Sequence, residues 1–244
     1  MKKNNSYRYP KTQRENVNGK RHYVFDKEKL PSVTTILDIT QPAEKRESLA
    51  KWRERVGEDS AARIMNEAAT RGTAMHKILE KYVLDEGYLD ETTVGKQAHN
   101  MAIQVIQNGL INMTEYYGTE CTLFYPGLYA GQTDLVGIHN DKETIIDFKQ
   151  ANRPKREEWI GDYKLQAGAY AMAHDHVHGS NIEQCVIMVC TPDLYYQEFK
   201  VEGPELRRWK HAFLKRLDMY HDLIFDEKEK AKVNMNPEDF FNGA

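Results

Sequence analysis

Two acids and a lysine carry the clearest chemical signal in this sequence. Asp134 and Asp147 are separated by twelve residues, and Lys149 follows Asp147 by two. Residues two apart in a strand point to the same face, and a hairpin would bring Asp134 close to Asp147. Clustered carboxylates repel each other unless a cation lies between them, and oxygen ligands suit Mg²⁺ or Mn²⁺. The pattern therefore predicts a metal site in which Lys149 orients a water molecule; a buried Asp147–Lys149 ion pair is the alternative.

The elements that must position these residues are strands. β-branched and apolar runs predict them, and residues 140–142 form a polar hairpin loop between two of them. The run at 184–191 is apolar on both faces, which indicates a fully buried central strand. The expected strands cover residues 119–125, 132–139, 143–149, 184–191 and 194–201.

Helices are predicted on both sides of this strand-rich region. Residues 73–84 show the spacing of an amphipathic helix whose stripe includes Met75, Ile78, Leu79, Tyr82 and Val83. Other helices are expected after residue 32 with Ser32 or Thr34 as a cap, over 44–69 with a break near Gly57, and over 93–112, 157–177 and 204–230. Buried positions are expected at Leu49, Trp52, Val56, Ile64 and Met65. The order predicts an α/β domain with a central mixed sheet flanked by helices.

Charge is distributed unevenly along the 244 residues. The chain has 34 Lys and Arg against 37 Asp and Glu, which excludes a protein that coats nucleic acid by bulk charge. Residues 1–29 hold nine basic and three acidic side chains, so they carry +6 and the remaining 215 residues carry −9. We expect 1–29 to be a solvated, partly disordered arm, or alternatively an arm that contacts phosphates. Residues 30–230 are expected to form one domain, with a tail at 231–244.

Cysteine usage and hydropathy indicate the compartment. The three cysteines, Cys121, Cys185 and Cys190, form no CxxC pair, and the two in the apolar run are expected to be buried. No apolar run reaches the roughly 20 residues that span a bilayer, and no signal peptide is evident. We expect a cytoplasmic protein of a bacterium or a phage-infected cell, with the mitochondrial matrix as the alternative.

Several other side chains could take part in chemistry, but each has an ordinary structural explanation when it is taken alone. His76 borders the apolar stripe of its helix, and Glu120 begins a strand. Gln166 and Tyr170 are four apart and share a helix face. The histidines at 174, 176 and 178 close a predicted helix, where cationic side chains are favourable, so we do not expect a metal cluster there.

Four short motifs change this interpretation when they are taken together. They are RGTAMH (71–76), GQTD (131–134), DFK (147–149) and QAGAY (166–170). In this order and secondary-structure context, they resemble the PD-(D/E)xK nuclease superfamily and its RecB-like exonuclease branch. PSVT (31–34), Trp52 and Gly57-Glu58 further resemble the mitochondrial genome maintenance exonucleases and their phage-encoded relatives.

The resemblance implies a restriction-endonuclease-like core and a set of roles. Lys149 would position or activate the water, and Glu120 would assist a second metal. The implied metal ligands are His76, Asp134, Asp147 and the Phe148 backbone carbonyl, with Mg²⁺ or Mn²⁺ as cofactor. The implied DNA contacts are Gln166, Tyr170, Ser32, Thr34 and Arg71. The implied reaction is phosphodiester hydrolysis that leaves a 5′-phosphate.

We therefore expect a metal-dependent DNA exonuclease that acts on single-stranded DNA or DNA ends in replication, recombination or repair. A single-strand-binding or recombination protein is a candidate partner.

Three cysteines are too few for the iron–sulphur cluster of some related nucleases, and no GxxxxGK[ST] loop is present. The alternatives are a non-catalytic nucleic-acid-binding module and a hydrolase of small phosphate esters. The basic cluster at Arg207, Arg208, Lys210, Lys215 and Arg216 favours a polymeric anion, unless it is simply a solvated helix face.

Overall fold

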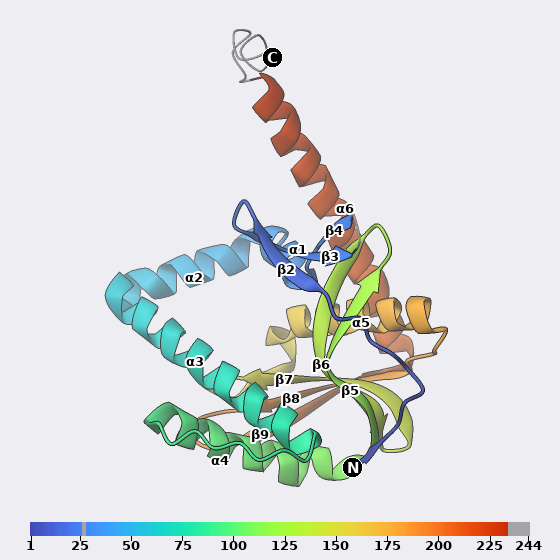
Figure 1. Ribbon diagram of the computed structural model, residues 1–244. Coiled ribbons are helices and arrows are strands. Elements are labelled where there is room, and N and C mark those ends of the chain that lie inside the picture. Colours follow the sequence, from blue (N-terminus) through green and yellow to red (C-terminus); the bar gives the residue numbers. More distant parts are fainter. Residues whose placement is uncertain (26–27, 234–244) are drawn as a thin grey trace.

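A six-stranded mixed sheet forms the centre of the protein (Figure 1). The computed structural model describes residues 1–25 and 28–233, with side chains up to residue 227. The strands of the sheet are β1 (Lys2–Lys3), β5 (Met113–Tyr125), β6 (Tyr129–His139), β7 (Lys142–Gln150), β8 (Gln184–Cys190) and β9 (Tyr196–Glu202). Their order is β1-β5-β6-β7-β8-β9, with β1–β5 and β7–β8 parallel and the other pairs antiparallel.

The β6–β7 hairpin turns within the predicted loop, which is one residue shorter than expected because Lys142 already belongs to β7. Asn140 and Asp141 both adopt positive φ, at 47° and 62°, as a two-residue turn between twisted strands requires. The paired residues run from His139 opposite Lys142 to Leu135 opposite Ile146. Asp134 and Asp147 each lie one residue beyond this last pair, so the hairpin brings both acids to the same end of the ladder.

Helices cover both faces of the sheet, which confirms the predicted α/β architecture. They are α1 (Val33–Ile39), α2 (Ala43–Val56), α3 (Glu58–Val83), α4 (Thr93–Asn108), α5 (Gly161–His178) and α6 (Gly203–Val233), with short 3₁₀ turns η1 (Leu110–Asn112) and η2 (Glu157–Trp159). The neighbours Ile145 and Ile146 point to opposite faces of β7, where each joins a different core cluster. Ile146 packs with α3 and α4, whereas Ile145 packs with α1, α5 and α6.

Helix α2 and the first part of α3 form an arm that extends away from the sheet (Figure 1). Gly57, with φ of 84°, separates them, which confirms the predicted break. Helix α3 then continues without interruption into the predicted 73–84 helix. The expectation of buried side chains at Leu49, Trp52, Val56, Ile64 and Met65 is wrong: Leu49 and Met65 are 40% and 43% exposed, and the other three are half-buried. The expectation that Tyr82 lies in the core is also wrong, because its side chain is 49% exposed.

Part of the N-terminal segment, for which a solvated and partly disordered arm is expected, is folded into strands. Strands β2 (Gln13–Val17), β3 (Lys20–Phe25) and β4 (Glu28–Pro31) form a second, three-stranded sheet. Tyr23 and Leu30 form a small buried cluster with Ala130 of β6, which attaches this sheet to the main one. The boundaries at residues 29 and 230 stay predictions, and residues 234–244 of the predicted tail lie outside the described residues.

Several local predictions can be compared with the structure directly. Ser32 caps α1 by accepting a hydrogen bond from the Thr35 backbone N–H at 3.0 Å, as expected. Cys185 and Cys190 are buried, also as expected. In the described part of the chain, no helix combines the length and the apolar character that crossing a membrane requires.

Candidate active site

Asp134 occupies the centre of a polar cluster at the end of the β6–β7 ladder. Its Oδ2 accepts a hydrogen bond from the Phe148 backbone N–H at 2.5 Å, and its Oδ1 lies 3.0 Å from His76 Nδ1. His76 projects from α3 beside Met75 and Leu79, whose buried side chains hold the helix against the sheet. The apolar stripe of α3 therefore fixes His76 over the strand that carries Asp134.

Glu120 joins this cluster from β5. Thr119 and Cys121 pair with Leu135 and Thr133 of β6, so Glu120 lies beside Asp134 on the neighbouring strand. Its φ of 49° is unusual for a residue with a side chain. One ligand atom each from His76, Glu120 and Asp134 lies within 4.8 Å of the others. The structure thus places Glu120 beside His76 and Asp134, and its role toward a second metal stays a prediction.

Asp147 and Lys149 share one face of β7, as their spacing predicts, and they form an ion pair. The Asp147 side chain is 8% exposed and the Lys149 side chain 19% exposed, so both are largely shielded from water. Lys149 Nζ also lies 5.2 Å from the ring centre of Tyr163. The ion pair considered as an alternative is therefore present, and it lies next to the carboxylate cluster.

The electrostatics of the cluster favour binding of a cation. Burial, with a contribution from Asp134, raises the pKa of Glu120 to about 7. Burial also raises the pKa of Asp147, although Lys149 opposes this shift. For Asp134, the nearby charges of His76 and Lys149 outweigh burial and lower the pKa. Carboxylates that lie close together repel each other when all of them are ionised, and a divalent cation bound between them would offset that repulsion.

A cavity of about 180 Å³ gathers most of the predicted site residues. Nine of them line it: Ser32, Thr34, His76, Glu120, Asp134, Asp147, Lys149, Gln166 and Tyr170. Gln166 Nε2 donates a hydrogen bond to Tyr170 Oη at 2.9 Å. A Cβ atom on Gly131 would lie 2.4 Å from the Tyr170 ring, so this ring requires the glycine in the GQTD motif. The roles assigned to these residues, and to the Phe148 carbonyl, stay predictions.

Arg71 is placed elsewhere. Its guanidinium donates hydrogen bonds to the side chains of Gln150 at 2.7 Å, Asn152 at 2.5 Å and Gln97 at 3.2 Å. The residue is 9% exposed and does not line the cavity. The structure therefore gives Arg71 a bracing position between α3, α4 and the end of β7 rather than a place at the candidate site.

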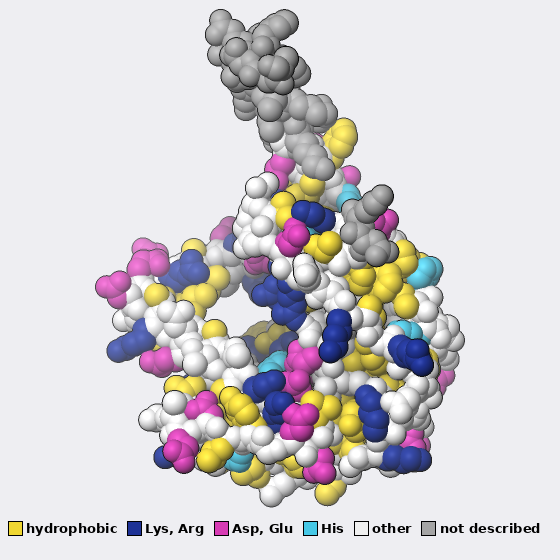
Figure 2. All heavy atoms as spheres, in the orientation of Figure 1, with side chains coloured by type: hydrophobic (Ala, Val, Ile, Leu, Met, Phe, Trp, Pro, Cys, Tyr) yellow, Lys and Arg dark blue, Asp and Glu magenta, His cyan; other side chains and the backbone are white. Residues whose placement is uncertain are grey.

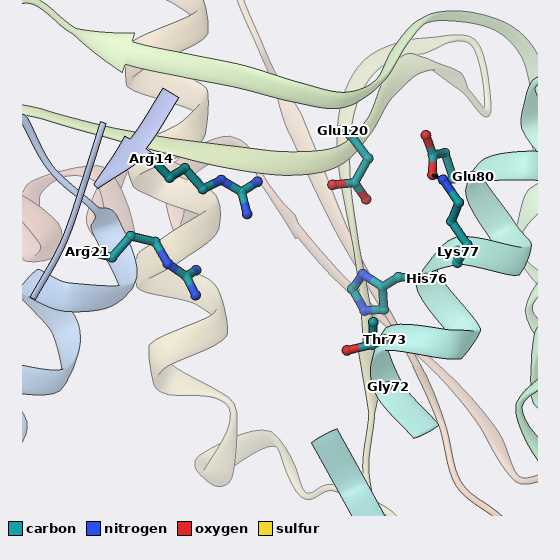
Figure 3. Close-up of a pocket in the computed structure, with 8 residues that line it drawn as sticks. All are labelled: Arg14, Arg21, Gly72, Thr73, His76, Lys77, Glu80 and Glu120. Carbon is teal, nitrogen blue, oxygen red and sulfur yellow. Dashed lines mark hydrogen bonds and ion pairs between the residues drawn. The ribbon is translucent and has the colours of Figure 1, made fainter. Parts of the chain in front are cut away.

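Three further cavity residues, Arg14, Arg21 and Tyr23, were not identified individually from the sequence. All three come from the N-terminal sheet. Arg14 and Arg21 also line an adjoining cavity of about 490 Å³ beside α3, and both point toward His76 and Glu120 (Figure 3). The alternation of Arg21, Tyr23 and Phe25 along β3 is the local signal that could have revealed this strand.

The histidines at the end of α5 have a structural explanation. His174 is fully buried, with Nε2 3.0 Å from Tyr9 Oη and Nδ1 2.7 Å from Ser180 Oγ. Burial lowers the pKa of His174 to about 3. The expectation of a favourable cation at this helix end is therefore wrong for His174, which is held neutral. His176 points elsewhere and stacks on Tyr125 at 4.2 Å between ring centres.

The donor set fits a divalent cation. One imidazole and two carboxylates converge within 4.8 Å, and a third carboxylate, Asp147, lines the same cavity. Carboxylate oxygens are the ligands that Mg²⁺ and Mn²⁺ prefer, and imidazole is the commonest nitrogen ligand for metals. The geometry is therefore that of a candidate metal centre, with Lys149 beside it.

Comparison with known proteins points to nucleases. The chain is 32% identical over 171 residues to mitochondrial genome maintenance exonuclease 1 of Mus musculus, covering 66% of the chain and 49% of that relative. It is 28% identical over 217 residues to the Xenopus tropicalis protein of the same name, covering 83% of the chain and 60% of that relative. The chain resembles mitochondrial genome maintenance exonucleases. The exonuclease resemblance predicted from the motifs is thereby confirmed, and the chain spans about half the length of the mouse relative.

Other comparisons are weaker. No protein-family model matches the chain. The solved structure of an alkaline exonuclease from Laribacter hongkongensis is similar over 83% of this chain and 93% of that one, with 13% identity and a TM-score of 0.35.

Proposed function

We propose that this chain is a metal-dependent DNA exonuclease that hydrolyses phosphodiester bonds. One observation carries the proposal: ligand atoms of His76, Glu120 and Asp134 lie within 4.8 Å of one another, in a cavity that Asp147 and Lys149 also line. The resemblance to mitochondrial genome maintenance exonucleases supports DNA as the substrate.

Mg²⁺ or Mn²⁺ is the proposed cofactor. His76, Asp134 and Asp147 would hold it together with the Phe148 carbonyl, and Glu120 would assist a second ion. When bound, such a cation stabilises negative charge on the phosphate and lowers the pKa of a water molecule.

The remaining chemistry belongs to the side chains of the cavity. Lys149, kept charged by Asp147, orients the attacking water and donates to a phosphate oxygen. A bond forms between the water oxygen and phosphorus while the bond from phosphorus to the 3′ oxygen breaks. The 3′ oxygen takes up a proton that the water has lost, so one fragment ends in a 3′ hydroxyl and the other keeps the phosphate on its 5′ oxygen. Gln166 and Tyr170 hold the strand, while Ser32 and Thr34 donate hydrogen bonds to a phosphate.

The shape of the molecule favours a single strand with a free end. Figure 2 shows an opening between the α2–α3 arm and the body of the protein, with Lys and Arg side chains on its inner edge. Such an opening suits a flexible, anionic polymer better than a small phosphate ester. We place the activity in replication, recombination or repair, with a single-strand-binding or recombination protein as the proposed partner.

Cleavage of matched DNA substrates tests the proposal. End-labelled linear single-stranded, linear duplex and circular single-stranded DNA are incubated with the protein and Mg²⁺ or Mn²⁺, or with EDTA. We expect degradation of linear single-stranded DNA with the metal, and none with EDTA or on the circle. Degradation of the circle would contradict an exonuclease. DNA binding without cleavage of any substrate would instead identify a non-catalytic binding module.

A further inference from the structure

Two arginines from the N-terminal sheet face the candidate metal centre. Arg14 and Arg21 line both the 180 Å³ cavity and the adjoining 490 Å³ cavity. In Figure 3 their guanidinium groups extend from one side toward His76 and Glu120, which come from the other side. The two cavities therefore meet between a pair of cations and the carboxylate cluster.

The register of the β2–β3 pair explains why both arginines point the same way. Arg14 lies opposite Tyr23, and Asn16 lies opposite Arg21. Directly paired residues share a face, and so do residues two apart in a strand. Arg14, Arg21 and the buried Tyr23 therefore occupy one face of the sheet, and all three line the 180 Å³ cavity.

The backbone that carries Arg21 is held in place by the start of α1. The Arg21 carbonyl accepts hydrogen bonds from Ser32 N–H at 3.0 Å and from Thr35 Oγ1 at 3.2 Å. The rings of Phe25 and Phe124, 4.3 Å apart, fix the end of β3 against β5. The arginines are thus presented on a packed scaffold.

The charged groups of Arg14 and Arg21 have a different environment from those of Lys20 and Lys29, which lie on the opposite face of the N-terminal sheet. Lys20 pairs with Glu227 at 2.9 Å and Lys29 with Glu15 at 2.7 Å. Among the described residues, neither Arg14 nor Arg21 forms an ion pair with a carboxylate. Both are exposed, and Arg14 lies 5.5 Å above the Tyr23 ring. The fork geometry of a guanidinium matches phosphate oxygens.

We propose that Arg14 and Arg21 bind backbone phosphates of the DNA strand next to the bond that is cleaved. This inference rests on the proposed function, because DNA is the substrate it invokes. It makes the N-terminal sheet a part of the active site: the carboxylate side binds the metal, and the arginine side binds the polymer.

Equilibrium binding of a labelled single-stranded oligonucleotide in EDTA, over a range of salt concentrations, tests the inference without requiring cleavage. We expect Arg14→Ala and Arg21→Ala each to weaken binding at least five-fold. Each should also reduce the slope of log K against log salt by about 0.7, the value for one phosphate contact on a single strand. Lys20→Ala and Lys29→Ala, on the other face of the same sheet, should bind within two-fold of wild type.

Arg14→Lys and Arg21→Lys serve as the second variants, since they keep the charge and disturb folding least. We expect them to retain the salt slope and lose part of the affinity, because lysine cannot form the two-pronged contact. Arginine variants that bind DNA like Lys29→Ala would overturn the inference.

Cleavage of linear DNA, measured in parallel with Mg²⁺, separates this inference from the proposed function. If wild type binds DNA with the expected arginine dependence but never cleaves it, the proposed function fails, and Arg14 and Arg21 are phosphate contacts of a DNA-binding protein that has no active site beside them. If wild type cleaves and the alanine variants bind and cleave normally, only the arginine assignment fails. If wild type does not bind DNA, both fail.

Discussion

His76 Nδ1 lies 3.0 Å from Asp134 Oδ1, although 58 residues separate the two along the chain. One is held by the buried stripe of α3 and the other by the β6–β7 hairpin, so the packing of a helix on a sheet creates the contact. Their placement is therefore a property of the folded chain itself, and a bound cation would enter a largely preformed site.

The first prediction concerns metal affinity. His76→Ala removes a nitrogen ligand and should weaken Mn²⁺ binding at least ten-fold in isothermal titration calorimetry, because each ligand of a small site contributes substantially. His211→Ala, on the surface of α6, is the matched control and should bind Mn²⁺ like wild type. Equal Mn²⁺ affinity of the His76 variant and wild type would show that His76 is not a ligand.

A second prediction tests the contact between Gly131 and Tyr170. A Cβ at residue 131 would lie 2.4 Å from Tyr170 Cε1, so Gly131→Ala must displace the ring from the cavity wall. We expect a loss of about 1–3 kcal/mol in the free energy of unfolding, as in other overpacked sites, and slower cleavage of single-stranded DNA. Gly87→Ala is the control, since nothing lies within 4 Å of its added Cβ. Cleavage by Gly131→Ala at the wild-type rate would argue against a role for Tyr170.

A third prediction explains the glycine within the QAGAY motif. A Cβ on Gly168 would lie 2.8 Å from the backbone carbon of Trp209, where α5 and α6 cross closely. Backbone cannot move aside as a flexible side chain can, so Gly168→Ala should cost about 1–3 kcal/mol in urea denaturation. Gly161→Ala, in the same helix, meets only a ring atom at an ordinary 3.8 Å and should not destabilise the protein. Similar stability of the two variants would contradict this close helix crossing.

The fourth prediction concerns pH and stability. Burial lowers the pKa of His174 to about 3, well below its value in an unfolded chain. Its contribution to stability is therefore fully present above about pH 6.5 and is lost as the pH falls toward 3. Between pH 6 and 4.5, wild type should lose up to about 1.4 kcal/mol per pH unit more than His174→Gln. Parallel curves for the two proteins would show that His174 is not buried in its neutral form.

Much of the fold can be predicted from local patterns. The Asn140-Asp141 turn and the runs on either side of it identify the hairpin that brings Asp134 and Asp147 together. The uninterrupted apolar run of β8 identifies a strand that is covered on both faces. Here the local preference and the tertiary environment agree, so sequence alone places the centre of the site.

Other features depend on contacts that no local pattern records. Leu49 has the spacing of a buried helix residue, yet α2 extends away from the body and leaves this side chain 40% exposed. Arg71 occurs in a nuclease-like motif, but side chains from α4 and the end of β7 take up its guanidinium. Arg14 and Arg21 reach the site only because Tyr23 and Leu30 attach a short, highly charged sheet to Ala130.

Lys149 and the adjacent carboxylates are the groups that we expect to hydrolyse DNA. The most direct measurement is the single-turnover cleavage rate of linear single-stranded DNA with Mg²⁺ or Mn²⁺, together with DNA affinity in EDTA, for Lys149→Ala and Lys142→Ala. Lys142 lies on the same strand and pairs with Glu202 at the surface. We predict that Lys149→Ala cleaves about 10²–10³-fold more slowly than wild type, because that is the cost of removing one stabilising donor. Its DNA affinity should stay within about three-fold of wild type. Lys142→Ala should cleave and bind DNA like wild type. Cleavage by Lys149→Ala at the wild-type rate would show that Lys149 takes no part in hydrolysis.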